Sequence, residues 1–190
     1  MVVLLTTSCQ LFNQNNENDL SEQRNLSEKQ LQDIRYKFKR EKAYKKKPLY
    51  QNKTDSAIIS IYNIINYKIK DEEVSNIVSG FSYYIFDISV DNYTQHPFDI
   101  GNFTKSCRLT SNQPDYLYSN VGYALKMYYL QSDSSEMDMD YMKRFYANQM
   151  PPKEFYRTRM FAFEVSKDDR NPLYFRYKIG DQLYSYKVRD

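Results

Sequence analysis

The feature that most constrains the fold is a run in which residues alternate with a period of two, GFSYYIFDISVDN at positions 80–92. One set of alternate positions contains Phe86, Ile88 and Val90, and the other contains Asp87 and Ser89. Successive side chains of a β-strand point to opposite faces of the sheet. This run therefore predicts a strand whose more apolar face, the one with Phe86, Ile88 and Val90, lies on a core.

A second alternating run lies near the C-terminus, in FYRTRMFAFEV at positions 155–165. Phe161, Phe163 and Val165 occupy one face, and Ala162 and Glu164 occupy the other. We expect the first face to be buried and the second to be wet.

Further strand candidates lie at 56–70, 105–111, 173–179 and 182–188. Gly180-Asp181 is typical of a tight hairpin turn between the last two. The apolar run at 123–130 fits a strand or the start of a helix, and 91–101 has the composition of a connection. The composition of 20 Tyr, 11 Phe and 4 Gly also favours sheet. Short strands separated by turns predict an all-β sandwich, which we assign to residues 51–190.

The chain begins with an apolar run, Val2 to Leu5, which is too short to span a bilayer. Small residues Thr6, Thr7 and Ser8 then precede Cys9, and this segment resembles the lipobox of bacterial lipoproteins, in which the cysteine is lipidated. Thr6 stands where that pattern usually has leucine, and no basic residue precedes the run. We interpret residues 1–9 as a signal remnant with Cys9 as the lipidation site. The alternative is a frayed cytosolic N-terminus.

Residues 10–50 are predicted to form a polar tether, disordered or helical, with a basic end. Its first part is dominated by Asn, Gln, Glu and Ser, which bury too little apolar surface to fold alone. The basic end, within residues 36–47, contains the following cations: Lys37, Lys39, Arg40, Lys42, Lys45, Lys46 and Lys47. These charges fit a solvated helix end, a patch on an anionic membrane surface, or a stacking surface for nucleic acid. The net charge of only +3 and the lack of a nucleic-acid motif argue against the last.

Residues that could carry out catalysis or bind a metal are scarce. The single histidine, His96, precedes Pro97 in a turn-like stretch, and we expect it on a surface loop. Cys107 is expected to be a small buried hydrophobe. The acidic segment 132–140 does not match a calcium-binding loop, and we interpret it as a solvated loop. We predict no catalytic residue, no metal site and no cofactor.

Two stretches together resemble the telokin-like immunoprotective extracellular domains of many bacterial lipoproteins. The first contains Val90-Asp91-Asn92 after the alternating strand, and the second contains Pro151-Pro152 followed by Phe163-Glu164-Val165 and Ser166-Lys167-Asp168. The resemblance covers residues 56–188 and implies an immunoglobulin-like sandwich beside a lipidated N-terminus. It implies no catalytic site.

The predicted function is that of a membrane-anchored cell-envelope lipoprotein that binds another envelope or secreted protein without catalysis. One such partner is a toxin, in which case this chain would be its immunity protein. The alternative is an intracellular structural subunit that uses the basic 36–47 segment to bind an acidic partner. An enzyme is the least favoured class, because no nucleophile or acid–base constellation is recognisable.

Overall fold

The computed structural model describes residues 26–68, 80–112, 117–120, 122–131 and 144–190. The chain divides into two compact units, Met1–Lys39 and Arg40–Asp190. Cys9, the first part of the tether and the acidic segment 132–140 lie outside the described residues.

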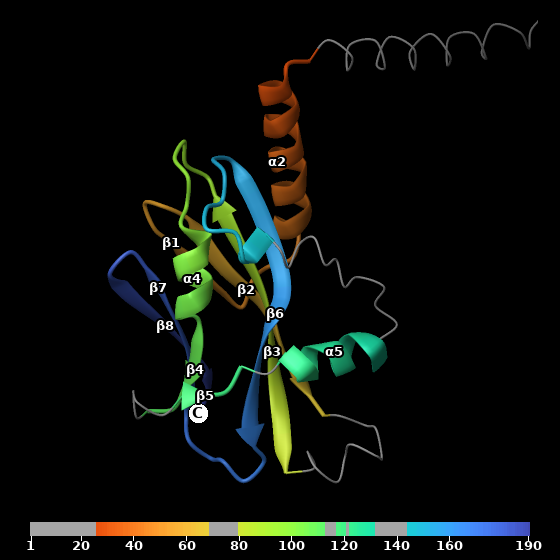
Figure 1. Cartoon of the computed structure of the whole chain (residues 1–190), viewed down its shortest axis with the longest axis vertical. Helices are drawn as coiled ribbons and strands as arrows, with labels where there is room; N and C mark the ends of the chain where they lie inside the picture. The colour runs from red at the N-terminus through yellow and green to blue at the C-terminus, as the bar shows by residue number, and fades with distance from the viewer. Residues whose placement is uncertain (1–25, 69–79, 113–116, 121, 132–143) are drawn as a thin grey trace, which may run out of the picture. The chain divides into compact units, whose positions relative to one another are not determined.

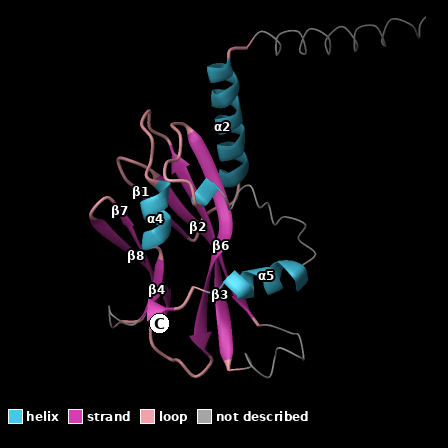
Figure 2. Ribbon diagram, in the orientation of Figure 1, coloured by secondary structure: helices cyan, strands magenta, loops and turns pink. Residues whose placement is uncertain are grey.

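The first sheet of the second unit is antiparallel and four-stranded, in the order β1-β2-β3-β6. Its strands are β1 (Tyr50–Lys53), β2 (Ile58–Tyr67), β3 (Phe81–Asn92) and β6 (Glu154–Ser166). Aromatic and β-branched residues are frequent in the three long strands, as pleated surfaces favour. Figure 2 shows these strands in magenta, with β3 and β6 side by side.

The second sheet is also antiparallel and four-stranded, in the order β5-β4-β7-β8. Its strands are β4 (Arg108–Thr110), β5 (Leu117–Tyr118), β7 (Leu173–Ile179) and β8 (Gln182–Arg189). Gly180 has φ +58°, the value that a type II′ hairpin turn requires at its first central position. The predicted hairpin turn at Gly180-Asp181 is confirmed.

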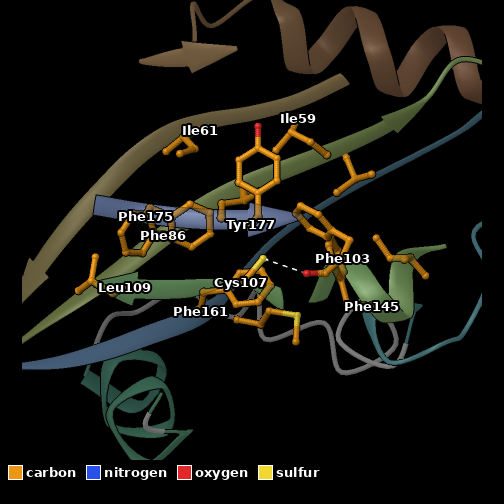
Figure 3. Packing of buried hydrophobic residues seen from close by; sticks show 14 of the residues in the cluster. Ile59, Ile61, Phe86, Phe103, Cys107, Leu109, Phe145, Phe161, Phe175 and Tyr177 are labelled. Atoms are coloured by element: carbon orange, nitrogen blue, oxygen red, sulfur yellow. Dashed lines mark hydrogen bonds between the residues drawn. The ribbon is translucent and has the colours of Figure 1, made fainter. Parts of the chain in front are cut away.

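The core lies between the two sheets and is mainly aromatic. The rings of Phe86 from the first sheet and Phe175 from the second are stacked, with centroids 4.6 Å apart. Phe161 and Phe163 of β6 pack edge-on against the same Phe175 ring. Figure 3 shows Phe86, Phe161 and Phe175 together with Tyr177 in this cluster. Two sheets packed face to face across one core confirm the predicted all-β sandwich.

The faces of β3 and β6 follow the predicted alternation, with one correction. Phe86 and Phe163 belong to the core between the sheets, as expected. Ala162 was expected to be wet but is fully buried. The reason is helix α5 (Gly122–Gln131), whose Ala124 and Leu125 pack in one cluster with Ala162 on the outer side of the sheet. The run at 123–130 is therefore helical.

Two other helices are described. Helix α2 (Glu28–Tyr44) begins at a capping box, because the Ser27 hydroxyl accepts from the Gln30 N–H and the Gln30 side chain accepts from the Ser27 N–H. Helix α4 (Ile100–Ser106) begins at Asp99, whose carboxylate accepts from the Asn102 N–H. The strand expected at 105–111 is correspondingly shorter, since its first residues lie in α4. Figure 1 labels all three helices.

None of the helices in the described ranges is long and apolar enough to cross a membrane.

Candidate functional site: an arginine cluster on the outer face of a sheet

The outer face of β3 carries a line of buried polar residues. Asp87, Ser89 and Asp91 alternate with core residues, so the pleat directs them away from the space between the sheets. All three are at most 2% exposed. Buried carboxylates require partners, and the partners of Asp87 and Asp91 define the site.

Asp87 is held by two arginines of β6. Arg157 donates from Nε to Oδ1 at 2.8 Å and from Nη2 to Oδ2 at 2.9 Å, a bidentate pair. Arg159 makes one longer contact, from Nε to Oδ2 at 3.4 Å. Arg157 and Arg159 share a face because they are two positions apart in one strand. We call Asp87, Arg157, Arg159 and the adjacent Tyr62 the arginine cluster.

Tyr62 of β2 packs against Arg157 in the arginine cluster. The guanidinium carbon of Arg157 lies 4.1 Å from the centroid of the Tyr62 ring, a cation–π contact. Burial raises the pKa of Tyr62, although the Ser89 and Ser60 hydroxyls and the Arg157 charge act in the opposite direction. The Tyr62 hydroxyl and the Ser89 hydroxyl are buried without a well-formed hydrogen bond among the described residues. Tyr62 therefore contributes packing and the attraction of its ring face for the Arg157 cation.

Among the described residues of the arginine cluster, the cations outnumber the carboxylates. Two guanidiniums face one carboxylate, and both arginine side chains are 31% exposed whereas that of Asp87 is 3% exposed. Guanidinium groups bind carboxylate or phosphate oxygens through directed N–H donors. The cluster can therefore bind one anionic group from solvent. Arg159 is the better placed of the two arginines to do so, because it makes only one long contact with Asp87.

Asp91 has different partners, which come from the end of helix α2. Its Oδ2 lies 2.8 Å from Arg40 Nε and accepts a hydrogen bond of 2.9 Å from the Tyr44 hydroxyl. Burial and the neighbouring Asp91 charge raise the pKa of Tyr44.

Arg40 was assigned to the basic patch, and the structure pairs it with a buried carboxylate, that of Asp91. Five members of that patch have exposed side chains: Lys37, Lys42, Lys45, Lys46 and Lys47.

Asn92 organises the loop after β3. Its side-chain amide donates to the carbonyls of His96 and Pro151 at 2.9 Å each, and its Oδ1 accepts from the Thr94 hydroxyl at 2.8 Å. His96 is exposed, as predicted. Asn92 is fully buried, so its role is to join this loop to the start of β6.

Cys107 is a structural residue. It is 1% exposed, and its Sγ donates to the Phe103 carbonyl at 3.3 Å (Figure 3). Burial raises its pKa well above the ordinary value for a thiol, against a smaller effect of Arg108. The expectation of a buried, small hydrophobe is confirmed, at the end of α4 rather than inside a strand.

One other place could hold a ligand. A hollow of about 530 Å³ lies between α4 and the β7–β8 turn, and Lys105 and Lys178 on its rim are exposed. Within the described part of the chain, no group of three or more His, Cys, Asp or Glu residues is placed to hold a metal ion.

Sequence reasoning missed the arginine cluster. The signal was present in Arg157-Thr158-Arg159, since a period of two places both arginines on one face. Their partner could not be found without the register, which sets Ser89 opposite Arg157 and brings Asp87 within reach.

The protein is therefore an antiparallel β-sandwich with a partly exposed arginine pair held by a buried carboxylate. No protein-family model matches the sequence, and no curated protein matches it.

Two solved structures are similar. A conserved hypothetical protein from Bacillus anthracis has 14% identity and a TM-score of 0.48, covering 74% of this chain and 92% of that one. An uncharacterized beta-sandwich protein from Clostridium difficile 630 has 15% identity and a TM-score of 0.40, covering 76% and 93%. Because both TM-scores are below 0.5, nothing about function follows from either likeness.

Proposed function

We propose that the protein is a lipid-anchored lipoprotein of the bacterial cell envelope that binds an acidic group of a partner protein without catalysis. The observation that carries the binding function is the arginine cluster, in which two partly exposed guanidiniums share one buried carboxylate. The proposed anchor is Cys9, on the basis of the small residues that precede it. The partner is an envelope or secreted protein, and a telokin-like domain would suit this location.

A feature of the first unit also supports a membrane-proximal location. Ile34 and Phe38, one turn apart on helix α2, are 51% and 67% exposed. Lys37, next to Phe38 in the helix, is exposed as well. Apolar and basic side chains exposed on one helix suit the boundary between water and anionic headgroups.

The binding function can be tested with a short aspartate-rich peptide as the probe. Titration of the protein with this peptide should shift the side-chain Nε–Hε NMR signals of Arg157 and Arg159. Arg159→Gln should weaken the response of Arg157 at least tenfold in peptide concentration, whereas Arg170→Gln, at an exposed position after β6, should leave it unchanged. If millimolar peptide shifts neither signal, or if both variants behave alike, the arginine cluster is not the binding site.

The anchor is tested separately, by fractionation of cells that express the protein. Cys9→Ala should move the protein out of the membrane fraction or leave an unprocessed precursor. Asn13→Ala, at the start of the polar tether, should change neither. A Cys9→Ala protein that remains processed and membrane-bound would contradict the lipoprotein assignment.

The second candidate is the intracellular structural subunit. It is favoured by the exposed lysines at the end of α2 and just after it, Lys42, Lys45 and Lys46, which could bind an acidic partner. The two candidates differ in the fractionation experiment, because only the lipoprotein depends on Cys9.

A further inference from the structure

The two sheets of the sandwich are joined along one side. The Glu164 N–H of β6 donates to the Ser119 carbonyl at 3.0 Å, and Asn120 forms a bridge with Phe163. This contact covers part of the outer edge of β6 with the residues that follow β5. The edge strands on the other side of the two sheets are β1 and β8. Of these, β1 has 4 residues and β8 has 8.

The backbone of β8 presents hydrogen-bonding groups to its open edge. In the described part of the chain, β8 pairs with β7 alone. Ile179 and Gln182 flank the two-residue turn and face each other, which makes them a hydrogen-bonded pair. Because hydrogen-bonded pairs alternate along an antiparallel ladder, the N–H and C=O groups of Leu183, Ser185 and Lys187 point away from β7.

The first five residues of this edge, Gln182 to Tyr186, lack the features that usually prevent strand addition. The strand has neither proline nor glycine, and Gln182 to Tyr186 carries no charge. Leu183 is 54% exposed. An uncharged segment of this kind at the edge of a sheet is a template for pairing with another strand.

We propose that β8 pairs with β8 of a second copy of the chain, antiparallel and centred on Ser185. The sequence around the centre is symmetric, Tyr184-Ser185-Tyr186, so each Tyr184 faces Tyr186 of the other copy. Cross-strand aromatic pairs of this kind stabilise sheets. The two second sheets then form one continuous sheet across the two copies.

The charges along the strand favour antiparallel over parallel pairing of two copies. Asp181 lies in the turn just before the strand, and Lys187 and Arg189 lie near its other end. Asp181 and Lys187 are exposed, and Lys187 is also ion-paired with Asp190 of its own chain. Antiparallel pairing brings Asp181 of each copy toward the basic end of its neighbour, whereas parallel pairing would align like charges. Pairing centred on Ser185 also sets Lys187 opposite Leu183 instead of opposite another lysine. The proposed dimer contact involves neither Cys9 nor the arginine cluster, so it does not depend on the proposed function.

The first test is sedimentation equilibrium of the full-length chain from about 5 to 200 µM, a range that covers the affinities of weak, specific complexes. All samples carry Cys9→Ala, so that neither lipid nor this thiol contributes. The parent chain should dimerise. Ser185→Lys places two ammonium groups at the two-fold axis and should raise the dimer Kd at least tenfold, while Asn66→Lys, at an exposed position of β2, should not. A parent chain that stays monomeric, or equal Kd values for Ser185→Lys and the parent, would overturn the proposal.

The second test fixes the register by cross-linking. Facing residues of a hydrogen-bonded pair have Cα atoms about 5.5 Å apart, within the range of a disulfide. Ser185→Cys should therefore form a disulfide-linked dimer on mild oxidation. Two copies of Leu183→Cys would be offset by four residues, about 14 Å, and should not cross-link. Equal cross-linking of both variants would overturn the Ser185-centred pairing.

Discussion

Replacing Asp87 with asparagine tests whether the arginine cluster is held as the structure shows it. The substitution keeps the shape of the side chain but removes the charge that accepts two short bonds, of 2.8 and 2.9 Å, from Arg157. A hydrogen bond between charged groups contributes about 1.5–3 kcal/mol, and loss of one partner of a buried pair costs about 3–5 kcal/mol. Water can reach the arginines, which are 31% exposed, so we expect a loss of about 3 kcal/mol in the free energy of unfolding.

Arg159→Gln is the matched comparison. Its only contact with Asp87 is 3.4 Å long, and the side chain is partly exposed, so its removal should cost well under about 1 kcal/mol. Urea denaturation followed by circular dichroism gives both values. A loss for Asp87→Asn within about 0.5 kcal/mol of zero, or an equal loss for Arg159→Gln, would refute the assignment of Asp87 as the anchor of the cluster.

The remaining predictions concern the core, the loop after β3 and alkaline stability. Phe163→Ala should cost about 3–5 kcal/mol because the ring is fully buried, whereas Glu164→Ala on the opposite face should cost about 1 kcal/mol; equal losses in urea melts would contradict the strand alternation. Asn92→Ala removes the amide donor to the His96 and Pro151 carbonyls, of which the His96 carbonyl keeps a bond from the Thr94 hydroxyl, and should cost about 2 kcal/mol, with faster hydrogen exchange in the loop that follows; unchanged exchange would show that Asn92 does not hold this loop. Burial raises the pKa of Cys107 and of Tyr177, while in the unfolded chain a thiol ionises near about 8.5 and a phenol near about 10. The free energy of unfolding should therefore be highest below about pH 8 and fall as the pH rises toward about 10, and equal urea midpoints at both pH values would contradict this.

Much of the sandwich could be predicted from local pattern. Phe86 and Phe163 lie in strands where every second residue is apolar, and that period alone places them on the core. Gly180 marked the last hairpin because its backbone conformation is costly for other residues. The helix α5 was ambiguous, since a short apolar run without clear periodicity fits either structure.

The failures arose where tertiary contacts decide the outcome. Ala162 is buried only because α5 packs over it, and no local pattern reveals a covering helix. Arg40 looked like one more cation of a basic run, but Asp91, far along the chain, pairs with it. The arginine cluster depends on the register of β3 with β6, which brings Asp87 to two arginines about 70 positions later in the sequence.

The measurement that tests the central claim most directly is mass spectrometry of the N-terminal proteolytic fragment, taken from protein isolated from bacterial membranes. The lipoprotein proposal predicts a mature chain that begins at Cys9 and carries the added mass of a diacylglycerol group on its sulfur. A fragment that still contains Thr6-Thr7-Ser8 and an unmodified Cys9 thiol would contradict it.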